Sequence, residues 1–296
     1  MKAALLPDRG VVKVAGDGAR DFLNGLLTAD IGAVSPAQAR FAALLTPQGK
    51  IVVDAIVVEA PAEEGNGFFL DCPRALTASF VAKLNFYKLR AKVIAEDLSE
   101  TLAVLAAWDG ELQKTYARAY HDPRLPTLGL RIMLAPSRAG EAAAALGAQL
   151  VDAAHYEAHR IALGVPRGGL DFIYGDAFPH EADMDQLAGV DFEKGCYVGQ
   201  EVVSRIEHRG TARTRIVPVA YEGFAPETGI AVTAGEKSVG TFGSAADGHG
   251  LAMLRLDRTD EALAAGLPLL AGGIALTPQK PTWARFAFPG EAKAAE

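Results

Sequence analysis

Runs of apolar residues bounded by turn residues mark the strands expected in the first third of the chain. The strands are predicted at residues 9–15, 41–45, 51–59 and 68–72. The turn at residues 46–50 joins two of them as a hairpin, because proline and glycine suit its positions. Asp54 interrupts an otherwise apolar strand, so it lies either on a solvated face or in a ligand cavity.

Apolar residues at a spacing of three and four predict the helices. They are expected at residues 17–27 with Asp17 as N-cap, at 76–87, at 141–147 and at 153–163. Further strands are expected at 102–108 and 130–135. This order predicts mixed α/β layers over residues 9–165, and neither a dinucleotide-binding nor a P-loop glycine pattern occurs in the sequence.

The pattern changes near residue 210. Short apolar runs then alternate with glycine, proline and aspartate turns, which predicts a small antiparallel barrel or sandwich. Its strands are expected at 216–220, 230–232, 238–242, 251–256, 268–270, 274–276 and 283–288. We therefore expect an α/β region at 1–210 with an internal boundary near 100, a β-barrel at 211–290 and a frayed tail at 291–296.

Composition limits the class of protein. The chain has 296 residues, 50% of them apolar, and a formal net charge of -7, so it is not a general binder of nucleic acids or anionic membranes. Its two cysteines cannot form a disulfide scaffold, and no apolar run approaches the ~20 residues that span a bilayer. Without a signal-peptide pattern at the start, these features predict a soluble, cytoplasmic protein.

Histidines and arginines offer weaker signals. His155 and His159 share a helix face, but the pattern H-Y-E-A-H is not a known zinc motif, so no metal site is predicted. His180 and Glu181 lie in a loop-rich segment and could act as acid–base groups or be ordinary polar loop residues. The cationic run at 205–215 could contact a polyanionic ligand tail, an RNA or an acidic partner, or could be a solvated strand edge.

The stretch Lys194-Gly195-Cys196-Tyr197-Val198-Gly199-Gln200-Glu201 carries the chemistry that stands out. The apolar spacing that follows it predicts a turn just ahead of a short amphipathic helix. A thiol beside a lysine or near a helix N-terminus has a lowered pKa, because the positive field favours the thiolate. The residues alone leave two readings of Cys196 open, a reactive thiol or a buried small apolar side chain.

These eight residues resemble the signature of the YgfZ/GcvT-like family of folate-binding proteins, which act in iron–sulfur cluster assembly and maintenance. Residues 21–31, 46–50, 156–172 and 178–185 also resemble family segments. The resemblance implies an α+β fold like that of the glycine-cleavage T-protein. That fold is a three-subdomain ring in which two mixed α/β subdomains and a C-terminal antiparallel β-barrel surround a cavity for tetrahydrofolate.

The resemblance also implies roles for individual residues. Cys196 would be the reactive thiol and Lys194 would favour the thiolate. Gly195, Tyr197 and Gly199 would shape the turn, while Gln200 and Glu201 would position the site. Asp54 falls near the carboxylate that T-proteins use in folate chemistry, and Arg160 begins a segment like their Arg-Leu-Glu-Ala-Gly, with Ala162 in place of the glutamate. The resemblance therefore makes Asp54 and Arg160 the expected folate contacts.

The function that follows is a tetrahydrofolate-binding accessory protein for iron–sulfur enzymes, including those that modify tRNA. Its expected partners are iron–sulfur assembly proteins or client iron–sulfur enzymes, with no membrane and no stable nucleic-acid complex. One cysteine cannot supply the usual four thiolates, so a stable cluster within one chain is not expected. The alternatives are an aminomethyltransferase or other one-carbon transferase that depends on Asp54, and an RNA-binding module that depends on Arg209 or Arg213. Whether the chain is an enzyme is left open.

Overall fold

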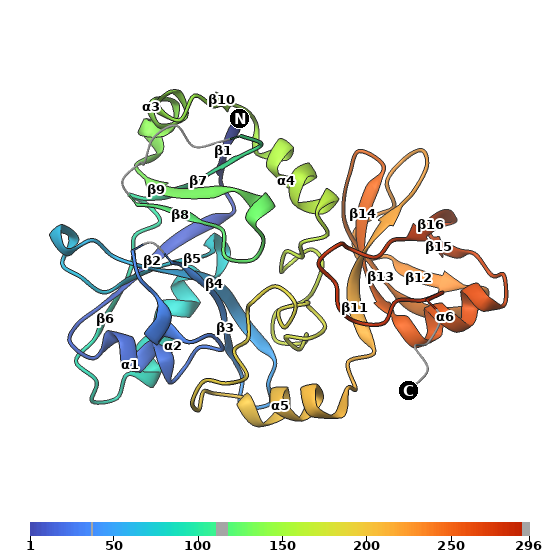
Figure 1. Cartoon of the computed structure of the whole chain (residues 1–296), viewed down its shortest axis with the longest axis horizontal. Coiled ribbons are helices and arrows are strands. Elements are labelled where there is room, and N and C mark those ends of the chain that lie inside the picture. Colours follow the sequence, from blue (N-terminus) through green and yellow to red (C-terminus); the bar gives the residue numbers. More distant parts are fainter. Residues whose placement is uncertain (37, 111–117, 292–296) are drawn as a thin grey trace. The chain divides into compact units, whose positions relative to one another are not determined.

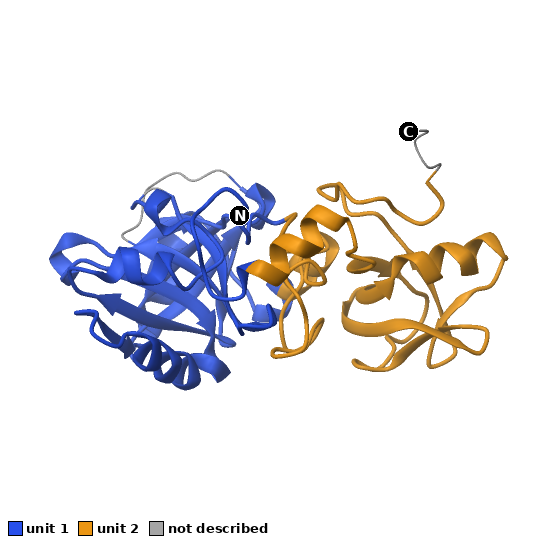
Figure 2. Ribbon diagram, turned by 90° about the horizontal axis from the view of Figure 1, so that it is seen from below, with its two compact units in different colours: residues 1–156, 187–200 blue, residues 157–186, 201–296 orange. Residues whose placement is uncertain are grey.

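A computed structural model describes residues 1–36, 38–110 and 118–291 of the chain (Figure 1). The chain forms two compact units that alternate along the sequence (Figure 2). Unit 1 consists of Met1–Tyr156 and Leu187–Gln200, and unit 2 of Glu157–Gln186 and Glu201–Glu296. The segment that carries Cys196 therefore returns to unit 1 after the chain has already entered unit 2.

One antiparallel sheet of unit 1 has the strand order β3-β4-β5-β2-β6. Its strands are β2 (Arg9–Ala15), β3 (Arg40–Leu45), β4 (Ile51–Glu59), β5 (Phe68–Pro73) and β6 (Ile94–Asp97). Helices α1 (Ala19–Asn24) and α2 (Thr77–Tyr87) contribute Leu23, Phe80 and Leu84 to its core, where Cys72 is also buried. The predicted hairpin is confirmed, since β3 and β4 pair across the turn at residues 46–50.

A second sheet of unit 1 has the order β10-β1-β7-β9-β8. Its strands are β1 (Lys2–Leu6), β7 (Ala103–Trp108), β8 (Ala119–His121), β9 (Leu130–Leu134) and β10 (Gln149–Leu150). Helix α3 (Ala139–Ala145) packs on this sheet through its alanines. The strand β1 was not predicted.

Unit 2 contains a closed barrel of antiparallel strands in the order β11-β14-β13-β12-β15-β16. The strands are β11 (Thr214–Ala220), β12 (Ala231–Ala234), β13 (Lys237–Ala246), β14 (His249–Arg255), β15 (Leu269–Ala271) and β16 (Ile274–Pro278). Phe242, Val217 and Leu254 fill its interior, and α6 (Leu256–Ala264) packs against the same core. Helix α4 (Ala153–Ala162) and helix α5 (Gln200–Arg209) begin at the two places where the chain passes from unit 1 to unit 2.

The fold class expected from the sequence is confirmed, but individual elements differ. Helix α1 is shorter than predicted and begins after Gly18, without a side-chain cap from Asp17. The strand predicted at 283–288 is irregular chain. Phe286 and Phe288 pack on the barrel core, yet the pairing of β16 with β11 leaves no edge for another strand. Of the predicted tail, residues 292–296 lie outside the described residues.

Short 3-10 helices occupy several connections of unit 1. They lie at Ile31–Ala33, Ala62–Glu64, Arg74–Leu76, Pro126–Leu128 and Pro136–Arg138. In the part of the chain that the structure describes, no helix combines the length and the apolar character needed to cross a membrane.

Candidate functional site

The loop that carries Cys196 leads directly into helix α5. Residues 191–199 have no helix or strand, and α5 begins at Gln200, as the sequence predicts. The Cys196 side chain is exposed, whereas the other thiol, Cys72, is buried and has a raised pKa because of that burial. Exposure excludes the reading of Cys196 as a buried apolar residue and makes it the accessible thiol of the pair.

Gly199 fixes this loop to the β3–β4 hairpin. Its φ of +83° lies in the left-handed region, and a Cβ there would stand 2.5 Å from the carbonyl oxygen of Thr46. Only glycine combines that conformation with such a close approach. Gly195 is different, because a Cβ at that position would meet nothing within 4 Å. The two sequence motifs at 46–50 and 194–201 are thus brought into contact at Gly199.

Lys194 anchors the other end of the loop. Its Nζ donates to the carbonyl oxygens of Asn24 and Leu27 at 2.7 Å and of Ala29 at 2.8 Å. An ammonium group has three N–H donors, so all of them are used in binding the chain at and after the end of α1. Any effect of Lys194 on the Cys196 thiol therefore acts through charge and not through a hydrogen bond.

Burial also changes the acidity of this lysine. Desolvation lowers the pKa of Lys194 to about 8, against the opposing charges of Asp30 and Asp191. The backbone N–H of Lys194 donates to Asp191 Oδ1 at 3.0 Å, which closes the turn ahead of Cys196. The ammonium group is therefore a partly desolvated charge held close to the loop backbone. The prediction that it favours a thiolate at Cys196 stays a prediction.

The residues after Cys196 change from buried at Tyr197 to exposed at Glu201. The Tyr197 ring is buried, 5.3 Å from Lys194 Nζ, and burial raises the pKa of its hydroxyl to about 12. Val198 packs against the core of the first sheet. Gln200 begins α5, and Glu201 forms an exposed pair with Arg205 at 2.8 Å on the same helix. Cys196 is thus presented to solvent between the half-buried Lys194 and the buried Tyr197.

Asp54 is buried in strand β4, so the alternative of a solvated face is wrong. Its carboxylate lies 4.0 Å from Arg9 Nη1. Arg9 in turn donates to Asp71 Oδ1 at 2.6 Å, and Asp71 Oδ2 accepts from Arg131 at 2.6 Å. Arg131 also reaches Asp122 at 2.9 Å. Asp54 therefore lies at one end of a buried network of alternating charges.

This network joins the two sheets of unit 1. Asp71 belongs to β5 of one sheet, while Arg131 on β9 and Tyr120 on β8 belong to the other. Desolvation would raise the pKa of Asp71, but Arg9 and Arg131 overcome it and lower that pKa. Sequence reasoning missed the network. The available signal was a single charge inside each of two apolar strands, Asp71 in β5 and Arg131 in β9.

Arg160, the other predicted folate contact, lies in unit 2 and is buried. Its Nε and one Nη2 hydrogen are donated to Glu157, and its Nη1 hydrogens to Val165 O and Asp171 Oδ2, both at 2.9 Å. The remaining Nη2 hydrogen goes to Ser244 Oγ at 2.8 Å. A guanidinium has five N–H donors, so none is left for a ligand. Arg160 therefore binds α4 to the following loop and to barrel strand β13.

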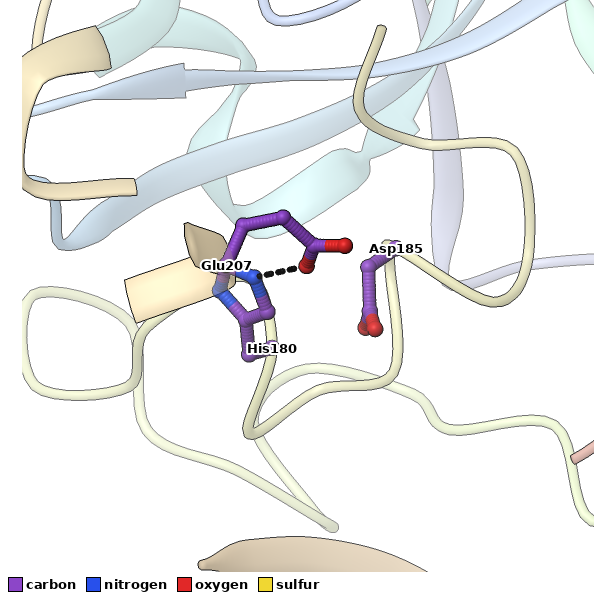
Figure 3. Close-up of side chains that lie close together, drawn as sticks. All are labelled: His180, Asp185 and Glu207. Atoms are coloured by element: carbon purple, nitrogen blue, oxygen red, sulfur yellow. Dashed lines mark hydrogen bonds and ion pairs between the residues drawn. The ribbon is translucent and has the colours of Figure 1, made fainter. Parts of the chain in front are cut away.

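His180, Asp185 and Glu207 gather in unit 2, where α5 meets the segment at 178–186 (Figure 3). One ligand-type atom of each lies within 4.8 Å of the others. His180 Nε2 is 3.0 Å from Glu207 Oε2, and the Asp185 carboxylate accepts both Nη groups of Arg215, at 2.6 and 2.9 Å. These pairs account for the cluster without a cation, so we assign no metal to it.

Arg215 also lies near a second buried acid, Asp183, whose pKa is raised. Asp183 is fully buried with a φ of +56°, and its Oδ2 has no hydrogen-bond partner. Burial raises the pKa of Asp183 well above its usual range, although Arg215 at 3.4 Å opposes the shift. The cationic run at 205–215 is divided between paired and exposed side chains. Arg205 is paired with Glu201, Arg213 lies 3.8 Å from Asp257, and Arg215 is buried among aspartates. His208 and Arg209 are exposed.

Comparison with known proteins finds relatives of this chain. Residues 213–286 match the family described as CAF17, C-terminal beta-barrel domain. The iron–sulfur cluster assembly factor IBA57 homolog, mitochondrial, of Mycosarcoma maydis is 38% identical over 74% of this chain and 57% of its own length. The mitochondrial iron–sulfur cluster assembly factor IBA57 of Mus musculus is 34% identical over 84% of this chain and 76% of its own length.

A solved structure supports the fold. The glycine cleavage system aminomethyltransferase T from Bartonella henselae matches with a TM-score of 0.73 at 16% identity, over 97% of this chain and 87% of that one. At this identity the likeness shows the fold alone. The chain spans just over half the length of two fungal relatives, 57% for that of Mycosarcoma maydis and 54% for that of Neurospora crassa.

The expectation of a cytoplasmic protein is wrong, because the relatives from two fungi, mouse and human all carry the description mitochondrial. Two unpaired cysteines indicate a reducing compartment, and that property does not distinguish the cytoplasm from the interior of an organelle. The expected YgfZ/GcvT-like grouping is confirmed for the GcvT-like fold. The relatives are named IBA57 and not YgfZ. By the identity of these relatives and the share of their length that is covered, the chain belongs to the IBA57 family.

Proposed function

We propose that this chain is an accessory protein for the assembly or repair of iron–sulfur clusters and that Cys196 is its working thiol. The observation that carries the proposal is the exposed Cys196, held on a loop between Lys194 and Gly199. The names of the IBA57 relatives, which describe iron–sulfur cluster assembly factors, supply the process. An anchored, exposed thiol suits brief contact with iron or with a cluster that another protein carries.

The number of cysteines favours a cluster whose ligands are shared with another protein over a cluster held within this chain. A cluster is usually held by four thiolates, and this chain has Cys196 and the buried Cys72. Cys72 lies in the core of the first sheet, where its raised pKa keeps it a thiol. The remaining ligands would come from an assembly protein or from the client enzyme. Clients that modify tRNA are part of the proposal through the family resemblance.

A rescue experiment tests the proposal. The full chain and its Cys196→Ser and Cys72→Ser variants would be expressed in a host that lacks its own family member. We expect the wild type and Cys72→Ser to restore iron–sulfur enzyme activity and the tRNA modification that depends on it, and Cys196→Ser to fail at equal protein level. Equal rescue by Cys196→Ser would refute the assignment of the thiol. Thermal unfolding of each purified protein controls for loss of fold.

Tetrahydrofolate binding is a separate part of the proposal and rests on fewer residues. Arg160 does not fit a folate contact, because its donors are all used within the protein. Asp54 fits better, since it is a buried carboxylate whose partner Arg9 is shared with Asp71. We expect titration with tetrahydrofolate to show binding that Asp54→Asn weakens and that a folded Arg160→Lys variant retains. Equal binding by wild type and Asp54→Asn would remove Asp54 from the site.

A further inference from the structure

The end of helix α2 displays large apolar side chains to solvent. Phe86 is 75% exposed, Leu89 is 89% exposed and Ile94, at the start of strand β6, is 64% exposed. Single exposed apolar residues are ordinary, but these three lie within nine positions, at the end of α2 and the start of β6, two elements that are in contact. Groups of exposed apolar side chains mark interaction sites. This position lies outside the Cys196 loop and outside the network around Asp54.

The same segment is cationic in an acidic chain. Lys83, Lys88, Arg90 and Lys92 alternate with the apolar residues, and no acidic residue occurs from position 77 to position 94. Among the residues that the structure describes, none of these four cations takes part in an ion pair. The chain as a whole has a net charge of -7, so this concentration of positive charge is a local contrast. We call Phe86, Leu89 and Ile94 together with these four cations the basic apolar patch.

The patch is ordered and held outward. Leu84 and Val93 are buried on either side of it, Lys88 N donates to Leu84 O at 3.0 Å, and Val93 N donates to Ala91 O at 2.9 Å. Leu89 has a φ of +44°, a left-handed conformation that is unfavourable for a residue with a side chain. A glycine or asparagine would suit this turn better, and a polar residue would suit its exposure. Stability of the chain alone does not explain a leucine there.

We propose that the basic apolar patch is a docking surface for a partner protein whose contacting face has an apolar centre surrounded by aspartate and glutamate. Charge complementarity selects the acidic rim, and the exposed apolar side chains select the centre. The edge strand β6 continues from the patch with the exposed acids Glu96 and Asp97. These acids would be repelled by an anionic membrane or by RNA phosphates, whereas a folded protein can place neutral or basic residues opposite them. The proposal goes beyond the function proposed for Cys196 and does not depend on it.

The test uses a photo-reactive phenylalanine analogue in the full chain. It would be placed at position 86 and, as a matched control, at position 224, where Phe224 is 92% exposed between Glu222 and Glu227. Irradiation in cells is expected to give a discrete protein adduct at position 86 that is absent at position 224. The captured protein would be identified, purified and titrated against the wild-type chain and against two variants. One variant reverses charge, Lys88→Glu with Arg90→Glu, and the other removes apolar surface, Phe86→Ser with Leu89→Ser.

We expect each double variant to bind the captured protein at least about tenfold more weakly, since central apolar anchors and matched charges dominate such interfaces. Lys237→Glu in the barrel should bind like the wild type, and added salt should weaken binding. Unchanged affinity in both double variants, or no adduct at position 86, would overturn the proposal. Lipid or RNA as the binding species would also overturn it. Flotation with vesicles containing phosphatidylserine and mobility shifts with single-stranded RNA, each compared between wild type and Lys88→Glu with Arg90→Glu, would reveal that outcome.

Discussion

The contact between Gly199 and the β3–β4 hairpin gives a sharp test of how the Cys196 loop is held. Substitution by alanine places a Cβ 2.5 Å from Thr46 O and 3.1 Å from Leu45 Cβ, in a backbone conformation with a φ of +83°. The left-handed conformation costs about 1–2 kcal/mol. Overpacking against a backbone oxygen, which has little freedom to move, adds about 1–3 kcal/mol. We therefore expect Gly199→Ala to destabilise unit 1 or to release the loop, at a total cost of about 2–5 kcal/mol.

The matched control is Gly195→Ala on the same loop, four positions earlier. A Cβ at position 195 meets nothing within 4 Å, so its effect should stay within about 0.5 kcal/mol. Urea unfolding measures the cost, and the rate of Cys196 modification by a thiol reagent measures release of the loop. Cys72 does not interfere, because it is buried. Equal stability and equal thiol reactivity in the two variants would refute the view that Gly199 fixes the loop.

Three further predictions concern charged groups. Lys194→Met leaves three carbonyl oxygens without their donor and should cost about 1–3 kcal/mol in urea unfolding, with faster modification of Cys196; unchanged values would contradict the anchoring role. Asp71→Asn removes the shared partner of Arg9 and Arg131 and should cost about 3–5 kcal/mol at pH 7. Because the folded pKa of Asp71 is lowered, its stabilising effect is present above the unfolded pKa of about 4 and is lost as the pH falls from there toward the folded pKa. The Asp71→Asn variant should therefore lose less stability between pH 5 and pH 3 than the wild type. The pH dependence is opposite for Asp183, whose folded pKa is raised: its contribution to stability is fully present below about pH 4 and is lost as the pH rises toward the folded pKa. Asp183→Asn should therefore reduce the loss of stability between pH 4 and pH 7. An equal slope of stability against pH in wild type and variant would argue against a buried neutral acid.

Short sequence patterns predicted the helices, strands and turns that form from residues close together in the chain. The hairpin at 46–50, the helix after Cys196 and the strands of the barrel follow from periods and turn residues within short windows. The strand expected at 283–288 has a suitable pattern, but the barrel is closed without it. Hydrophobic pattern reports which side chains are buried and not which strands pair.

Long-range polar contacts escaped prediction for a physical reason. Lys194 binds carbonyl groups 165 to 170 positions earlier, and a backbone carbonyl has no signature in a sequence. The partners of Asp71 on the second sheet, Tyr120 and Arg131, lie 49 and 60 positions away. Arg160 was identified through resemblance, yet its five donors are occupied by groups that only the folded chain brings together.

The interleaving of the two units also sets the order in which their residues become available during synthesis. Both sheets of unit 1 are complete in sequence by Tyr156, but its last segment, Leu187–Gln200, is made only after the first part of unit 2. At 5–20 residues per second, synthesis from Tyr156 to Gln200 takes roughly 2–9 s. During that interval Lys194 and Gly199 have not yet been made. The hairpin carbonyl that faces Gly199 and the carbonyls that accept from Lys194 therefore lack these partners. The residues of both sheets of unit 1 are therefore made before the residues that anchor the Cys196 loop.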